Sequence, residues 1–218
     1  MGNVCGIDES GRGPVIGPMV IAGVVVTEDK LDELKNLGVK DSKLLSARKR
    51  EYLFDKITEK ADKYEIIIVY PKEIDETLRH PSLNLNILEK LRIADIINKL
   101  KPDKAIIDCP SPNANAFKMQ LKAELSYKPE LIVEHKADTN YVIVGAASVL
   151  AKVTRDREIN NIKKKIGIDF GSGYATDPKT QEFLKNNHDK HDIFRKEWSP
   201  YRRVDSLKRQ KKLEDFNN

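Results

Sequence analysis

The sequence predicts an α/β protein built on a mixed sheet with helices on its faces. Two strand-like apolar stretches open the chain, and helical and strand patterns then alternate. Strands that come first and then alternate with helices are typical of a mixed sheet. In such sheets the functional site lies at the carboxyl ends of the strands, and three predicted strands end at or just before an aspartate.

The first twenty residues hold the densest group of chemically useful side chains. A short apolar run ends in Asp8 and Glu9, and Gly11, Arg12 and Gly13 follow almost at once. Acids offer hard oxygen ligands to a divalent ion, and glycines let a nucleic-acid backbone approach closely. The alternative is a polar hairpin turn, but the acids combined with Gly-Arg-Gly favour a metal-dependent phosphate site.

The other elements follow from apolar spacing and from turn residues. Strands are rich in Val and Ile, whereas helices repeat apolar residues every three or four positions. Ser46 is the predicted N-cap of the first helix, and Pro102 ends the second. The predicted strands after the first are residues 19–26, 64–70, 105–108 and 131–134, and the predicted helices are residues 46–61, 84–99, 114–125, 140–165 and 179–186.

Composition limits the class of protein. The 218 residues are 39% hydrophobic and 33% charged, with a mean hydropathy of -0.54, which indicates a soluble chain with a core. No apolar run can span a bilayer and no signal peptide is evident, so we expect a cytoplasmic protein without a membrane partner. The net charge of +5 is compatible with nucleic acid, and residues 195–212 are more basic than the rest. We expect a monomer.

Two cysteines, Cys5 and Cys109, form neither a disulfide framework nor a zinc spacing. Each stands near an acid at a predicted strand end, and strand alternation turns each away from that acid. We therefore interpret both as buried free thiols.

Four acids are candidate metal ligands: Asp8, Glu9, Asp108 and Asp138. Carboxylates suit Mg²⁺ or Mn²⁺ rather than zinc, and two such ions about 3.5–4 Å apart can clamp a phosphodiester. Strict alternation puts Asp8 and Glu9 on opposite faces of their strand. Both reach one site only if the strand ends or bulges there, which the following glycines make plausible.

Six stretches of the chain match a known family in the expected order. They are residues 6–18 (GIDESGRGPVIGP), 40–43 (KDSK), 107–108 (ID), 135–138 (HKAD), 146–157 (AASVLAKVTRDR) and 171–174 (GSGY). Together they resemble ribonuclease HII, the type 2 ribonuclease H, in its archaeal form. The resemblance implies a ribonuclease H-like five-stranded mixed sheet flanked by helices, with a helical C-terminal extension. We expect the catalytic domain over residues 1–187 and a basic tail over residues 188–218.

The resemblance also implies metal-dependent cleavage of RNA in RNA–DNA hybrids and at single ribonucleotides in duplex DNA. By this resemblance, the catalytic metal ligands are Asp8, Glu9, Asp108 and Asp138. The residues that sense the ribonucleotide are Gly11, Arg12, Gly13 and Tyr174. A protein that distinguishes RNA from DNA must approach the 2′-hydroxyl closely. The glycines leave room for this approach, and Tyr174 offers a ring that can stack and a hydroxyl that can form a hydrogen bond. The alternative for Tyr174 is a surface loop tyrosine.

A polar stripe follows on the long predicted helix, where Ser148, Lys152 and Arg155 are spaced at i, i+4 and i+7. We interpret them as contacts to nucleic-acid phosphates, together with Lys40, Ser42 and Lys43. The alternative is a solvated helix face.

The C-terminal region carries two weaker patterns. Gln210, Leu213 and Phe216 resemble the sliding-clamp-binding box, although Asn217 stands where a second aromatic residue is usual. The alternative is a basic tail helix that ends in Leu and Phe by chance. Residues 188–192 resemble a histidine ligand cluster, but we interpret them as a solvated, mobile stretch.

The function predicted from these features is a two-metal endoribonuclease that leaves a 3′-hydroxyl and a 5′-phosphate. A DNA junction nuclease on the same fold is the nearest alternative, and the paired Gly-Arg-Gly and Tyr174 disfavour it. The other alternative is a non-catalytic hybrid-binding module, which the four acids disfavour because they repel phosphates unless metals neutralise them.

Overall fold

The computed structural model describes residues 2–39 and 45–216, and the side chains as far as Gln210. These residues form two compact units. Unit 1 comprises Met1–Ser10, Val20–Ile68 and Leu85–Arg155, and unit 2 comprises Gly11–Met19, Val69–Asn84 and Asp156–Asn218. The predicted contact residues Lys40, Ser42 and Lys43 lie outside the described residues.

Unit 1 is built on the predicted five-stranded mixed sheet. Its strands are β1 (Asn3–Ser10), β2 (Met19–Thr27), β3 (Lys63–Val69), β4 (Lys104–Asp108) and β5 (Glu130–Glu134), in the order β3-β2-β1-β4-β5. β1 pairs antiparallel with β2 and parallel with β4, and β4 pairs parallel with β5. Parallel neighbours bring the carboxyl ends of β1, β4 and β5 to the same edge of the sheet.

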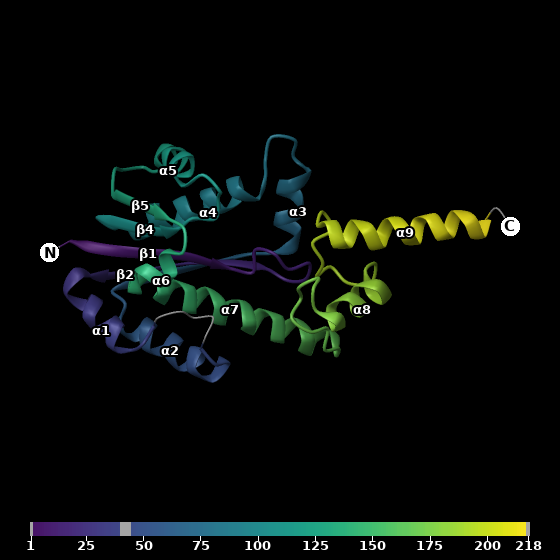
Figure 1. Ribbon diagram of the computed structural model, residues 1–218, viewed down its shortest axis with the longest axis horizontal. Coiled ribbons are helices and arrows are strands. Elements are labelled where there is room, and N and C mark those ends of the chain that lie inside the picture. Colours follow the sequence, from purple (N-terminus) through teal and green to yellow (C-terminus); the bar gives the residue numbers. More distant parts are fainter. Residues whose placement is uncertain (1, 40–44, 217–218) are drawn as a thin grey trace. The chain divides into compact units, whose positions relative to one another are not determined.

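Helices cover both faces of this sheet (Figure 1). On one face lie α1 (Leu31–Asn36), α2 (Ala47–Lys60), α6 (Ala137–Asn140) and the first half of α7 (Val142–Ile166), which share a buried apolar core with alternate residues of β2. On the other lie α4 (Leu85–Leu100) and α5 (Ala114–Ala123). Gly6 permits the close approach of α7, because a Cβ at this position would lie 2.3 Å from the carbonyl oxygen of Ile143.

The predicted elements are confirmed, with shifts of one or two residues at their ends. Ser46 caps α2 as expected, since its hydroxyl accepts a hydrogen bond from the Lys49 amide. Five elements were not predicted: η1 (Glu28–Lys30), α1, α3 (Pro71–Arg79), α6 and α9 (Ser199–Phe216). The first four are nine residues or shorter, which leaves little length for a helical repeat to appear. The longer α9 lies in the stretch that was interpreted as a basic tail.

Unit 2 has its own apolar core. Val15, Ile16, Phe170, Phe183 and Phe194 are all buried in it. It includes α3, α8 (Pro178–Asn187) and α9 (Ser199–Phe216), together with the second half of α7. The segment that follows β1 forms a β-bridge from Ile16 to Phe194, so residues about 180 positions apart in the chain lie side by side.

The interpretation of residues 188–192 as a solvated stretch is wrong for the histidines. The His188 side chain is 4% exposed, and its carbonyl accepts a hydrogen bond from the Tyr201 hydroxyl. The His191 ring stacks on Phe183 with centroids 5.8 Å apart. Both histidines are therefore packed against the aromatic core of unit 2.

The two thiols differ in burial. Cys5 is fully buried, as expected, and burial raises the pKa of its thiol. Cys109 is half-buried, and its thiol donates to the carbonyl of Ser111 at 3.2 Å. Among the described residues, no helix combines the length and the apolar character needed to cross a bilayer.

Candidate active site

Three of the four predicted acids meet at the carboxyl edge of the sheet in unit 1. Asp8, Asp108 and Asp138 each offer a carboxylate oxygen, and these oxygens lie within 4.8 Å of one another. Ile7 pairs with Ile107 in the parallel ladder, so Asp8 and Asp108 follow at the same level on neighbouring strands. The pairing of β1 with β4 is thus sufficient to bring Asp8 and Asp108 close together.

Asp138 reaches the same place by a turn after β5. Lys136 has a left-handed backbone conformation, with φ 59 and ψ 34, and the chain then enters the short helix α6. The Ala137 amide donates to Oδ1 of Asp108 at 3.1 Å, which ties the start of α6 to β4. Asp138 is 3% exposed and lies in the first turn of α6 rather than in a strand.

Burial and like charge shape the chemistry of the group. Burial raises the pKa of Asp8 well above its ordinary value, and the charges of Glu9 and Asp108 act in the same direction. Hydrogen bonds from the Ser148 hydroxyl and from the Glu9 amide, the latter at 2.7 Å, partly oppose this shift. Crowded carboxylates of this kind are stable as anions only beside cations, and their oxygens are the ligands that Mg²⁺ and Mn²⁺ prefer. The donor set therefore fits a divalent metal.

The structure does not bring Glu9 into this group of three. β1 pairs with β2 residue by residue through Ser10, so the bulge that the sequence suggested is absent from β1. On a strand with regular alternation, Glu9 is expected on the face opposite Asp8. Glu9 contributes charge to the site, because it raises the pKa of Asp8.

The polar stripe on α7 divides into buried and partly exposed members. Ser148 is buried and directs its hydroxyl to Asp8, and Arg155 is 3% exposed. The alternative of a solvated helix face therefore does not describe these two residues. Lys152, between them, is half-buried.

The predicted ribonucleotide-sensing residues meet within unit 2. The amides of Val15 and Ile16 donate to the carbonyl of Gly173 at 2.9 and 3.2 Å. A Cβ at Gly13 would lie 3.6 Å from the Tyr174 ring, so the ring borders the Gly-Arg-Gly stretch. Tyr174 is 39% exposed, which leaves its ring accessible.

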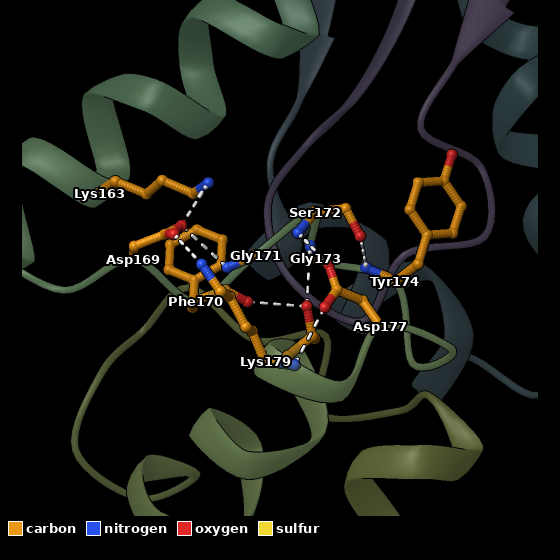
Figure 2. Close-up of polar contacts among 10 residues, drawn as sticks. Lys163, Asp169, Phe170, Gly171, Ser172, Gly173, Tyr174, Asp177 and Lys179 are labelled. Atoms are coloured by element: carbon orange, nitrogen blue, oxygen red, sulfur yellow. Dashed lines mark hydrogen bonds and ion pairs between the residues drawn. The ribbon is translucent and has the colours of Figure 1, made fainter.

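The loop that carries Tyr174 is held by a dense set of hydrogen bonds (Figure 2). The Asp177 carboxylate accepts from the amides of Ser172 at 2.7 Å and Lys179 at 3.0 Å, and so caps α8. The buried hydroxyl of Thr180 accepts from the Gly173 amide and donates to the Phe170 carbonyl. In Figure 2 the Tyr174 ring points away from these contacts, as expected for a residue presented to a ligand.

Sequence reasoning missed several residues that support these sites. The partnership of Ser148 with Asp8 has no local signal, because it depends on how α7 lies against β1. The partly buried segment at residues 193–201 did have a sequence signal, because Ile193, Phe194, Trp198 and Tyr201 interleave with the polar residues there. This apolar content predicts a packed segment rather than a solvated tail.

Comparisons with known proteins agree with this geometry. The family model for ribonuclease HII matches residues 5–200. Ribonuclease HII of Pyrococcus furiosus is 46% identical over 211 residues, or 95% of this chain and 93% of that protein. The crystal structure of ribonuclease H2 from Pyrococcus horikoshii OT3 superimposes with a TM-score of 0.87 at 45% identity, over 95% of this chain and 99% of that one.

A further solved structure, the complex of PCNA with RNase HII from Archaeoglobus fulgidus, superimposes with a TM-score of 0.82 at 41% identity, over 90% of this chain and 95% of that one. The fold and the group of acids define a ribonuclease H, a nuclease that hydrolyses phosphodiester bonds. Within this class the chain belongs to the ribonuclease HII family, whose endonuclease activity depends on divalent metal.

Proposed function

We propose that the protein cleaves the RNA strand of RNA–DNA hybrids, and also duplex DNA at single embedded ribonucleotides, leaving a 3′-hydroxyl and a 5′-phosphate. The meeting of Asp8, Asp108 and Asp138 within 4.8 Å carries this proposal. The preference for ribonucleotides rests on Gly13 and Tyr174, which are neighbours in unit 2. RNA differs from DNA there by a hydroxyl that donates and accepts hydrogen bonds.

In this proposal Asp8, Asp108 and Asp138 hold Mg²⁺ or Mn²⁺, with Glu9 as a fourth ligand once its side chain turns toward the site. When bound, the ions supply Lewis acidity and neutralise charge that develops on phosphate oxygens. Ser148 orients the Asp8 carboxylate through its hydroxyl, and the Ala137 amide orients that of Asp108. Tyr174 stacks on a sugar of the substrate, and its hydroxyl, with the backbone of the Gly-Arg-Gly stretch, contacts the 2′-hydroxyl of the ribonucleotide.

One cleavage assay tests the function against its alternatives. The substrates are a duplex with a single ribonucleotide, a full RNA–DNA hybrid and an all-DNA duplex, each with Mg²⁺, Mn²⁺ or EDTA. We expect metal-dependent cleavage of the first two, with ligatable 3′-hydroxyl and 5′-phosphate ends. Cleavage of the all-DNA duplex at a comparable rate would instead indicate a DNA junction nuclease, and binding without cleavage a hybrid-binding module.

We propose a phosphate contact for Lys152, the partly exposed member of the α7 stripe. In a cleavage-deficient background, Lys152→Ala should weaken hybrid binding and reduce the slope of log affinity against log salt by about 0.9, the value for one phosphate contact. Lys122→Ala is the matched control, because Lys122 is exposed at the end of α5, far along that helix from the carboxyl end of β4. An unchanged slope in Lys152→Ala would show that Lys152 makes no phosphate contact and is an ordinary residue of the helix surface.

We also propose that the C-terminal residues bind a sliding clamp. A related RNase HII has been solved in complex with PCNA, and Gln210, Leu213 and Phe216 carry the matching pattern here. The backbone of α9 is helical through Phe216, as a short helical plug for an apolar groove requires. Phe216→Ala should weaken capture of the protein by an immobilised clamp ring at least about tenfold, while leaving hybrid cleavage without the clamp unchanged. Equal capture of both proteins would overturn this proposal.

A further inference from the structure

Two backbone carbonyls of the Gly-Arg-Gly stretch, those of Gly11 and Arg12, converge on one buried guanidinium in unit 2. Arg195 is fully buried. Its Nη2 donates to the carbonyl of Gly11 at 2.6 Å, its Nη1 to that of Arg12 at 2.8 Å, and its Nε to that of Gly17 at 3.0 Å. One side chain thus fixes the orientation of two peptide groups of this stretch and of a third at Gly17.

A neighbouring side chain extends this contact. The Trp198 indole N–H donates to the carbonyl of Gly13 at 3.1 Å, and the guanidinium of Arg195 lies over the Trp198 ring, 4.9 Å from its centroid. All three carbonyls of the Gly-Arg-Gly stretch are therefore held by Arg195 or Trp198.

The segment that carries these two residues is itself anchored. The carboxylate of Asp75, buried in α3, accepts hydrogen bonds from the amides of Lys196 and Glu197, both at 2.9 Å. In addition, the Arg195 amide donates to the carbonyl of Val15 at 2.9 Å. The backbone of Arg195 is therefore fixed by contacts of its own. Its side chain can hold the carbonyls of the Gly-Arg-Gly stretch in one orientation.

The direction of the carbonyls determines the direction of the amides. In a trans peptide the C=O and the following N–H point in opposite directions, and the structure has no cis peptide among its described residues. The carbonyls of Gly11 and Arg12 point at Arg195, so the N–H groups of Arg12 and Gly13 point away from it. Gly11 has a φ of 83, a left-handed conformation that side chains disfavour and that turns the chain at this point.

We propose that Arg195 is a positioning residue for ribonucleotide recognition: by holding the carbonyls of Gly11 and Arg12, it presents the N–H groups of Arg12 and Gly13 as preorganised donors to the 2′-hydroxyl. This role rests on the proposed function and deepens it. Trp198 supports the same geometry at Gly13, and Asp75 holds the segment that bears both. Donors that are fixed before binding discriminate more strongly than donors that must first be ordered.

The test measures discrimination rather than activity. In an Asp108→Asn background, which prevents cleavage, affinity is measured for a duplex with one ribonucleotide and for the identical all-DNA duplex. The ratio of the two affinities reports recognition of the 2′-hydroxyl, whereas a general loss of duplex binding leaves it unchanged. We expect Arg195→Met to lower the ratio at least about tenfold and Arg195→Lys to lower it less. Trp198→Phe, which removes the indole donor but keeps an aromatic ring, should lower it by about 2–5-fold.

Arg203→Met is the matched control, since Arg203 is an exposed arginine of α9 in the same unit and its loss should not alter the ratio. Circular dichroism confirms that each variant is folded, and Arg195→Lys and Trp198→Phe carry the test if Arg195→Met does not fold. A wild-type ratio near one overturns the proposed ribonucleotide recognition and this role with it. A wild-type ratio well above one that persists in the folded variants overturns the role of Arg195 alone.

Discussion

Replacement of Asp108 by Asn is expected to lower the cleavage rate of an RNA–DNA hybrid by at least about 10³-fold. Metal ions contribute several kcal/mol of charge stabilisation to phosphoryl chemistry, and each 1.36 kcal/mol is about tenfold in rate. Asp108 lies at the end of β4 beside Asp8 and Asp138, so one lost negative oxygen weakens the shared site. Single-turnover cleavage at saturating enzyme measures the chemical step directly.

The substitution should leave the fold intact. Asn is isosteric, and its side-chain oxygen can still accept the hydrogen bond from the Ala137 amide. Asp55→Asn is a suitable control, because Asp55 is an exposed acid of α2 in the same unit and should cleave at the wild-type rate. If Asp108→Asn kept more than a tenth of the activity, the group of three acids would not be the catalytic centre.

Replacement of Asp8 by Asn is expected to make the metal-free protein more stable at neutral pH while abolishing cleavage. Asp8 is a buried acid whose anion is disfavoured by burial and by the charges of Glu9 and Asp108. The neutral amide removes that penalty and can still accept hydrogen bonds from Ser148 and the Glu9 amide. For a chain of this size we expect a rise in Tm of about 3 °C or more in EDTA.

The pH dependence of this effect follows from proton binding. A raised pKa means that folded, metal-free protein keeps a proton on Asp8 that the unfolded chain releases near pH 4. The stability from this proton is present below about pH 4 and is lost as the pH rises through the folded pKa. The Tm advantage of Asp8→Asn in EDTA should therefore grow from acid to neutral pH.

Divalent metal should reverse the order of stability. Binding at 100 times the dissociation constant stabilises a folded protein by about 2.7 kcal/mol, or roughly 5–10 °C for a chain of this size. We expect Mg²⁺ or Mn²⁺ to raise the Tm of the wild type and to leave Asp8→Asn almost unchanged. Thermal unfolding at pH 5 and pH 8, with EDTA or metal, measures all of these effects, and an equal response to metal in both proteins would exclude Asp8 as a ligand.

Features of this protein that depend on neighbouring residues were predictable from the sequence, whereas several that depend on distant residues were not. The helix of residues 46–61 was predictable because Ser46 and the apolar spacing are local signals, and the structure confirms its cap. The convergence of the acids was also predictable, since Asp8 and Asp108 close short apolar strands whose carboxyl ends meet in a parallel sheet. Strict alternation also predicted opposite faces for Asp8 and Glu9, but whether β1 bulges there was not predictable, because the regular pairing of β1 through Ser10 depends on its partner strand.

The sequence by itself determined the succession of strands and helices, the acids at their ends and the family, because these depend on residue order and short-range spacing. Only the tertiary structure decided which polar groups support those residues. Ser148 meets Asp8 because Gly6 lets α7 lie close to β1, and Arg195 meets the carbonyls of the Gly-Arg-Gly stretch from 183 or more positions away. Such partnerships arise from packing between distant segments, and local sequence carries no signal for the pairing.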